Sequence, residues 1–183
     1  MRRLLALALC ALAAACGARQ EVRIGSRRIR PLPVRQAAWT VSPNAKGALT
    51  EIPVEDFARL GAVDPAIMGQ AAGSRVTLQL ALQGSGPQDD LRGLGFLVDT
   101  GTYAGLKTQV STRDPGRFVI LPLPAPADGY FACSPNLKSA GSCMLKMRRG
   151  EVTVTSAVNP KALRNWSAVI GAYDRVVDQA LVK

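Results

Sequence analysis

The chain of 183 residues contains no histidine. Histidine is the commonest general base in enzymes and a frequent metal ligand, so its absence excludes Ser–His and Cys–His catalytic pairs and disfavours a metal site. Cysteine is scarce too, with four residues in the chain and none spaced as Cys-x-x-Cys. We therefore expect no metal, no cofactor and no thioredoxin-like redox activity.

Signals for nucleotide binding and for repeat folds are also missing. The loop at residues 84–87 contains glycine but is not followed by the Gly-Lys-Ser of a phosphate-binding loop. The sequence has no internal repeat and no low-complexity tail. We therefore expect one globular domain without nucleotide-binding loops or repeats.

The first sixteen residues indicate export from the cytoplasm. Arg2 and Arg3 precede an apolar run over residues 4–15, which is too short to span a hydrocarbon core of about 30 Å. Three alanines then lead into Cys16 and Gly17. This arrangement resembles the lipobox of bacterial lipoproteins, which implies cleavage before Cys16 and attachment of lipid to its thiol. The alternative is an ordinary secretory signal that leaves Cys16 free.

In lipoproteins of this kind an Asp after the cysteine signals retention at the inner membrane. The chain has Gly17 there instead, so the resemblance implies an outer-membrane lipoprotein that faces the periplasm. A cell-surface lipoprotein is the alternative localisation.

Removal of residues 1–15 leaves 21 Lys and Arg against 13 Asp and Glu, a formal charge of +8. Because an exported protein does not meet chromosomal DNA, we expect no nucleic-acid partner. We predict that residues 16–35 form a lipidated basic tether, whose cations face anionic headgroups at the membrane surface. An arginine-rich tether that is merely soluble is the alternative. The six cations of this segment are Arg19, Arg23, Arg27, Arg28, Arg30 and Arg35.

The remaining cysteines form an even pair. Cys10 leaves with the signal and Cys16 carries the lipid, so that Cys133 and Cys143 remain in an oxidising compartment. We predict that these two residues form a structural disulfide.

Residues 36–183 predict one mainly-β domain of about eight strands, built as a β-sandwich or as a strongly twisted antiparallel sheet. In residues 76–82 apolar side chains alternate with polar ones, which is typical of a strand with one buried face. The apolar run at residues 94–98 predicts a central strand, and residues 84–90 a polar loop. Asn159 and Pro160 begin an amphipathic helix over residues 159–182, whose apolar side should lie across the sheet. Further predicted strands cover residues 37–41, 106–111, 118–121, 130–133, 143–147 and 151–155, and a short helix covers residues 53–60.

One motif has mechanistic content. Asp99, Thr100 and Gly101 follow the apolar residues 96–98, and this order resembles the active-site turn of retropepsin-like aspartic proteases. The resemblance implies a homodimer in which Asp99 of two copies shares a proton, while Thr100 and Gly101 hold the turn. The simpler interpretation is a turn at the end of a strand. We therefore assign no catalytic residue and keep the protease as an alternative.

A small basic patch is expected at the hairpin after Cys143, formed by Lys146, Arg148 and Arg149. It would suit the acidic face of a partner, although exposed hairpin ends are commonly cationic without any such role.

These observations predict a membrane-anchored envelope lipoprotein that acts as a non-enzymatic binding or assembly component and docks on another envelope protein. The first alternative is the homodimeric aspartic protease. The second is a carrier that holds a lipid or small ligand between the sheet and the helix.

Overall fold

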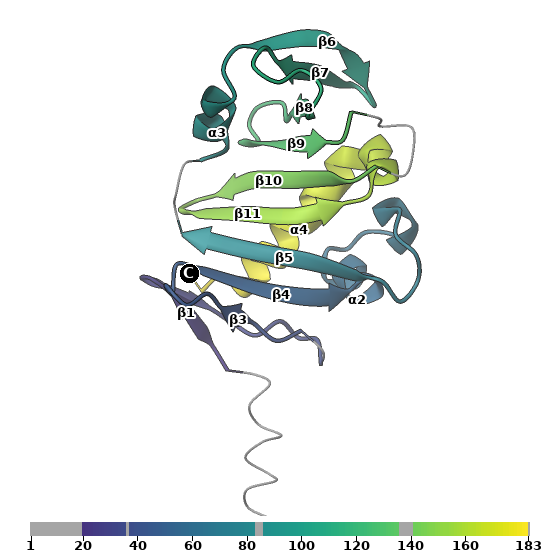
Figure 1. Ribbon diagram of the computed structural model, residues 1–183. Helices are drawn as coiled ribbons and strands as arrows, with labels where there is room; N and C mark the ends of the chain where they lie inside the picture. Colours follow the sequence, from purple (N-terminus) through teal and green to yellow (C-terminus); the bar gives the residue numbers. More distant parts are fainter. Residues whose placement is uncertain (1–19, 36, 83–85, 136–140, 183) are drawn as a thin grey trace, which may run out of the picture.

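A computed structural model describes residues 20–35, 37–82, 86–135 and 141–182 (Figure 1). Its strands are β1 (Val22–Ile24), β2 (Arg27–Ile29), β3 (Thr40–Val41), β4 (Gly47–Pro53), β5 (Arg75–Leu82), β6 (Leu97–Tyr103), β7 (Leu106–Ser111), β8 (Val119–Pro122), β9 (Gly129–Cys133), β10 (Cys143–Arg149) and β11 (Val152–Val158). Its helices are α2 (Val54–Leu60), α3 (Pro87–Gly93) and α4 (Trp166–Ala180), with the 3₁₀ helices η2 (Pro65–Met68) and η3 (Pro160–Asn165).

The sheet has nine strands in the order β3-β4-β5-β11-β10-β9-β8-β7-β6, and every neighbouring pair is antiparallel. β1 and β2 form a separate hairpin below β3 and β4 (Figure 1). The prediction of a mainly-β domain with a C-terminal helix is confirmed. Of the two predicted arrangements, the structure has the single antiparallel sheet.

The main core lies between one face of the sheet and the helices α2 and α4. Val76, Leu78 and Leu80 point into it from β5 and are fully buried, because the alternate residues of a strand share one face. Phe57 of α2 packs against Tyr173 of α4, with ring centroids 4.7 Å apart. The Tyr173 hydroxyl lies 2.7 Å from Ser156 Oγ on β11, which joins α4 to the middle of the sheet.

A second, smaller cluster lies on the other face. Leu91 of α3 packs with Ile120, Tyr130 and Ala132 of β8 and β9. Phe131, between the last two, belongs to the main core, so β9 is buried on both sides. α3 therefore covers the β8–β9 part of the face opposite α4.

The prediction of a tether is wrong for residues 20–35, which belong to the fold. Ile24 and Ile29 are fully buried in the main core. Arg30 donates its backbone N–H to Ala180 O at 2.7 Å, and Val182 donates to Arg28 O at 3.2 Å. The isoleucines between the arginines supply the apolar face that holds the hairpin. Cys16 and Arg19 lie outside the described residues.

Two further local predictions are wrong. Residues 94–98 are not a central strand, because β6 forms the edge of the sheet and Phe96 is 84% exposed. Residues 84–90 were predicted as a loop, but Pro87 begins α3, where Asp89 accepts a hydrogen bond from Gly86 N at 3.0 Å. The C-terminal helix begins as predicted, and its first part is the 3₁₀ helix η3.

Candidate protein-binding face

Among the residues that the structure describes, no helix packs on one face of the sheet over β4, β5, β11 and β10. It is the face opposite α4, and α3 lies beside it over β8 and β9. On β5, Thr77 and Ala81 are half-buried and Gln79 is exposed, whereas the residues between them are buried beneath α4. We call this surface the open face and define it by seven uncharged side chains: Leu49, Thr77, Gln79, Ala81, Met144, Thr155 and Ala157.

The register of the strands brings these side chains together. Leu49, Gln79 and Thr155 are direct neighbours in one row across β4, β5 and β11. Met144 and Ala157 pair in the next row. Leu49 and Met144 are large apolar side chains that are 39% and 44% exposed. The surface therefore mixes apolar area with hydroxyl and amide groups, which suits contact with another protein.

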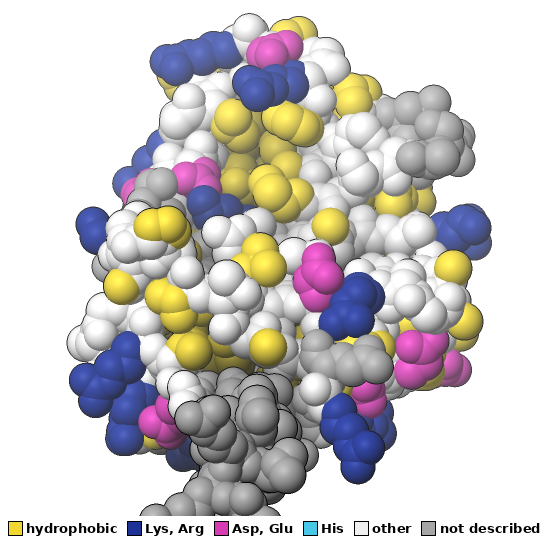
Figure 2. Space-filling model, turned by 60° about the horizontal axis from the view of Figure 1, so that its bottom comes forward, with side chains coloured by type: hydrophobic (Ala, Val, Ile, Leu, Met, Phe, Trp, Pro, Cys, Tyr) yellow, Lys and Arg dark blue, Asp and Glu magenta, His cyan; other side chains and the backbone are white. Residues whose placement is uncertain are grey.

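Charged side chains border the seven residues of the open face, and Lys146 on β10 is the direct neighbour of Thr155. Glu51 contacts Arg75 at 3.4 Å, and Lys146 forms an ion pair with Asp90 of α3. Figure 2 shows the molecule from its lower end, with white and yellow side chains in the middle of the view, one magenta and one dark-blue group beside each other among them, and most other charged groups toward the rim. The charges at the edge are thus largely paired with each other.

A groove of about 530 Å³ adjoins the open face where β3, β4 and β5 meet. Gly47 lines the groove, and a Cβ there would make a tight contact with Leu80 O at 3.2 Å. The turn that borders the groove is fixed by side chains. Ser42 Oγ lies 2.7 Å from Asn44 Oδ1 and accepts a hydrogen bond from Gly47 N at 3.0 Å. The groove is therefore a preformed hollow at the margin of the open face.

The structure does not form the predicted basic patch. Lys146 and Arg148 lie on the side of the open face, whereas Arg149 points to the side of α4, because neighbouring residues of a strand alternate. Arg148 contacts Asp128 at 3.5 Å, and Arg149 contacts Asp178 at 2.8 Å. All three cations therefore have acidic partners and do not form one free cationic surface.

The Asp99-Thr100-Gly101 motif lies within the edge strand β6, at a bulge between Asp99 and Gly101. Asp99 is exposed, and it accepts hydrogen bonds from Gln109 Nε2 at 2.7 Å and from Lys107 Nζ at 3.4 Å. The bond from Gln109 and the charge of Lys107 lower the pKa of the Asp99 carboxyl. Thr100 Oγ1 donates to Thr108 O at 3.2 Å. An exposed carboxylate with a lowered pKa is unlike one that shares a proton with a second carboxylate.

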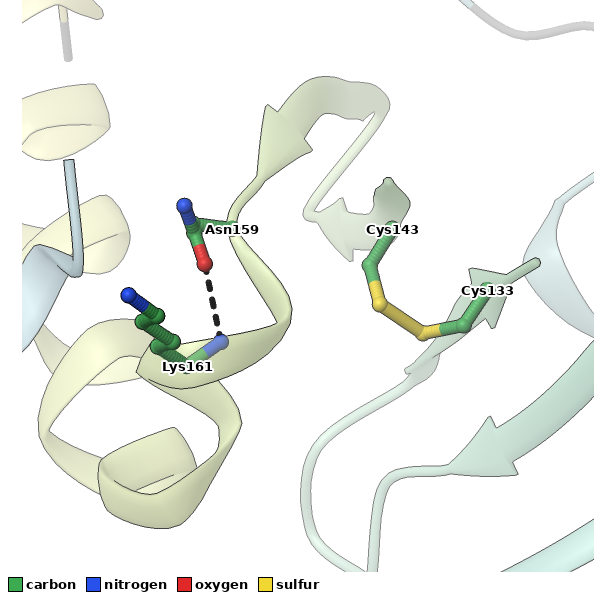
Figure 3. The surroundings of a disulfide bond; sticks show 4 residues. All are labelled: Cys133, Cys143, Asn159 and Lys161. Atoms are coloured by element: carbon green, nitrogen blue, oxygen red, sulfur yellow. Dashed lines mark hydrogen bonds between the residues drawn. A yellow bond between two sulfur atoms is a disulfide. The ribbon is translucent and has the colours of Figure 1, made fainter. Parts of the chain in front are cut away.

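The disulfide between Cys133 and Cys143 is present, as predicted (Figure 3). The two cysteines are direct partners across β9 and β10, and both are buried. Beside them, Asn159 Oδ1 accepts a hydrogen bond from Lys161 N at 2.9 Å at the start of η3. Disulfides form in extracytoplasmic compartments, so this bond is consistent with the expected export of the chain.

Across the described part of the chain, no three Asp, Glu or Cys side chains are grouped so that they could hold a metal ion. Within the same residues, no helix has both the length and the apolar character needed to cross a bilayer.

The open face was not among the predicted site residues. The sequence pattern of residues 76–82 contains an indication of it: the apolar residues of the alternation predict a buried face, and the residues between them predict an exposed face. That β4, β5, β11 and β10 lie side by side depends on the topology of the sheet, which the sequence pattern does not give.

No protein-family model matches the chain, and no curated protein matches it in sequence. Its fold is similar to that of Smlt3025, an immunity protein of the Stenotrophomonas maltophilia type IV secretion system, with a TM-score of 0.57. The similarity covers 91% of this chain and 94% of that chain, at 12% sequence identity. The two chains therefore share a fold.

Proposed function

We propose that this chain is an immunity protein of the bacterial envelope, which binds a protein toxin and keeps the toxin from its target. The observation that carries the proposal is the fold shared with Smlt3025 over nearly the whole length of both chains. A fold alone does not determine function, so the proposal also rests on the surface that the chain offers to a partner.

The open face supports this role. Four strands about 4.8 Å apart and about seven residues long cover roughly 450 Å², about half of the ~800 Å² that each partner contributes to a standard interface. The groove beside β3 extends this area. Charged residues are depleted in the cores of interfaces, and the charged side chains on this side of the sheet, Glu51, Arg75, Lys146 and Arg148, each form an ion pair. In this proposal the toxin docks on the open face.

The export signal and the disulfide support a site of action outside the cytoplasm. In this proposal Cys16 carries lipid and the domain faces the periplasm from the outer membrane. A toxin delivered into the periplasm would then meet the immunity protein before it reaches its target.

The protease alternative lacks support from the geometry of Asp99, which is exposed and held by Gln109 and Lys107. Binding needs no reacting group, so we expect Asp99→Asn to leave protection unchanged. A protease would lose its activity with the same substitution.

The test is a contact competition in the bacterium that encodes this chain. A strain that lacks the gene is mixed with its parent, and survival of each strain is counted. We expect the parent to kill the deletion strain, and a plasmid copy of the wild-type gene to restore survival. Equal survival of the deletion strain without the plasmid would contradict the immunity function.

Variants on the same plasmid test the open face. Thr155→Arg places a long cationic side chain between Gln79 and Lys146, its direct neighbours on β5 and β10, which should cost several kcal/mol of toxin binding and abolish protection. Thr102→Arg makes the same change on the exposed edge strand β6 and should protect as the wild type does. Protein levels of both variants are compared by immunoblot. Full protection by Thr155→Arg would show that the toxin docks elsewhere, whatever the outcome for immunity itself.

A further inference from the structure

The β1–β2 hairpin has one apolar and one cationic face. Ile24 and Ile29 are fully buried on the inner side. On the outer side, Arg23 and Arg28 are exposed and lie directly opposite each other in the ladder. Like charges that face each other across two strands repel, so this pair favours an anion nearby.

The hairpin is held firmly in place. Gly25 at its turn donates a backbone hydrogen bond to Ala45 O at 2.8 Å, and Ile29 forms a bridge with Leu181 at the end of the chain. Arg30 donates its backbone N–H to Ala180 O at 2.7 Å. The arginine side chains therefore extend from a backbone that is hydrogen-bonded to the rest of the domain.

This end of the molecule carries an excess of positive charge. Ion pairs hold many of the other cations, but in the described part of the chain four exposed cations at this end have no acidic group within 4.0 Å: Arg23, Arg30, Arg35 and Lys46. Arg28 approaches Glu21, at 3.8 Å. Arg27 lies on the inner side and contacts Glu151 at 2.8 Å, so it does not add to the positive charge of the outer face. Figure 2 shows dark-blue groups at the lower left and lower right of this end.

The same end lies close in sequence to Cys16. Gln20, the first described residue, follows Cys16 by four positions, a distance of at most about 14 Å for an extended chain. If Cys16 carries lipid, as the proposed function holds, the hairpin lies within reach of the headgroups. A cation near an anionic membrane surface strengthens binding by about fivefold.

We propose that the outer face of the β1–β2 hairpin, with Arg23, Arg28 and Arg30, binds the anionic phospholipid surface of the membrane that carries the lipid anchor. The inference rests on the proposed function for the attachment through Cys16. In this orientation β3 is the sheet strand nearest the membrane and β6 the one farthest from it, and the open face points to the side, parallel to the membrane surface (Figure 1). The hairpin thus orients the domain for its toxin.

The experiment uses the mature chain, residues 16–183, with Cys16→Ser so that no lipid contributes to binding. Its partition onto vesicles is measured by sedimentation, with phosphatidylcholine alone and with an equal mixture of phosphatidylcholine and phosphatidylglycerol. We expect binding to the anionic vesicles only, weakened by added salt. The absence of binding to anionic vesicles would overturn the proposal.

Two pairs of substitutions test the place of binding. Arg23→Gln with Arg28→Gln should weaken binding about 25-fold, from about fivefold for each cation. Lys161→Gln with Arg164→Gln removes the same charge from exposed positions on η3 and should change binding less than twofold. Equal losses in both pairs would show a general effect of net charge and overturn the proposal. Thermal unfolding followed by circular dichroism establishes that each variant is folded.

The result is independent of the toxin, since the vesicle assay needs none. A chain that binds anionic vesicles through the hairpin but gives no protection in the competition assay would contradict only the proposed function. A chain that protects but does not bind vesicles would contradict only the membrane contact.

Discussion

Tyr173 and Ser156 join α4 to the middle of the sheet through two hydroxyl groups. The Tyr173 side chain is fully buried, and its hydroxyl lies 2.7 Å from Ser156 Oγ. Ser156 donates in turn to Thr77 O at 2.6 Å. Because the Ser156 hydroxyl donates its one proton to Thr77 O, the Tyr173 hydroxyl is the donor to Ser156 Oγ. The hydrogen bonds therefore run from Tyr173 to Ser156 and from Ser156 to Thr77.

The two single substitutions should therefore differ in cost. Tyr173→Phe removes one hydrogen bond and leaves Ser156 bonded to Thr77, a loss of about 1 kcal/mol. Ser156→Ala removes both bonds and leaves the Tyr173 hydroxyl buried without a partner, a loss of about 3 kcal/mol. The double variant has no unpaired hydroxyl and should lose about 2 kcal/mol, less than the sum of the two single losses.

The assay is urea unfolding of the mature chain, followed by tryptophan fluorescence and by far-ultraviolet circular dichroism. The free energies of unfolding of the wild type, both single variants and the double variant give the coupling between the two side chains. The reasoning is refuted if Tyr173→Phe costs as much as Ser156→Ala, or if the two losses add.

Three further predictions follow from packing, the disulfide and titration. Replacing Cys133 and Cys143 together with alanine opens a loop with a sequence separation of 10 and should lower the free energy of unfolding by about 3 kcal/mol in urea. Gly61→Ala places a Cβ 2.7 Å from Ala172 Cβ, between α2 and α4, and should lower the free energy of unfolding by about 1–3 kcal/mol. The control is Gly93→Ala, whose Cβ meets nothing within 4 Å and which should leave the free energy of unfolding nearly unchanged in the same assay. Burial raises the pKa of Tyr130 to about 12, whereas the same phenol has a pKa of about 10 in the unfolded chain. The unfolded chain therefore loses this proton at a lower pH than the folded one, and the free energy of unfolding should fall from about pH 10 toward pH 12. Tyr130→Phe should reduce that fall, which is measured by thermal unfolding at alkaline pH.

Several features were determined by the sequence alone, because they depend on neighbours along the chain. The alternation in residues 76–82 is a local pattern, and the structure has β5 there with the predicted side buried. Asn159 caps the start of the C-terminal helical segment by accepting a hydrogen bond from Lys161 N, and Pro160 occupies the first helical position. The disulfide followed from counting cysteines in an exported chain, without knowledge of the strands that bring them together.

Other features were decided only by the tertiary structure. Residues 20–35 contain as many arginines as aliphatic residues, five of each, so composition alone does not place the segment inside or outside the domain. The packing of Ile24 and Ile29 in the main core, and the bridge from Ile29 to Leu181 after α4, make it part of the domain. Residues 94–98 are apolar enough for a central strand, but the order of the strands places β6 at the edge.

The open face depends both on the local sequence pattern and on the tertiary structure. The sequence specifies that β5 and its neighbours each have a polar side, since a two-residue period is local. It does not specify that β5 pairs with β11, where Ser156 Oγ donates a hydrogen bond to Thr77 O, 79 residues away in the sequence. Nor does it specify that α2 and α4 pack on the same side of the sheet. Pairings over such distances are chosen by the packing of the whole core, and that choice sets which side chains of β4, β5, β11 and β10 lie opposite α4.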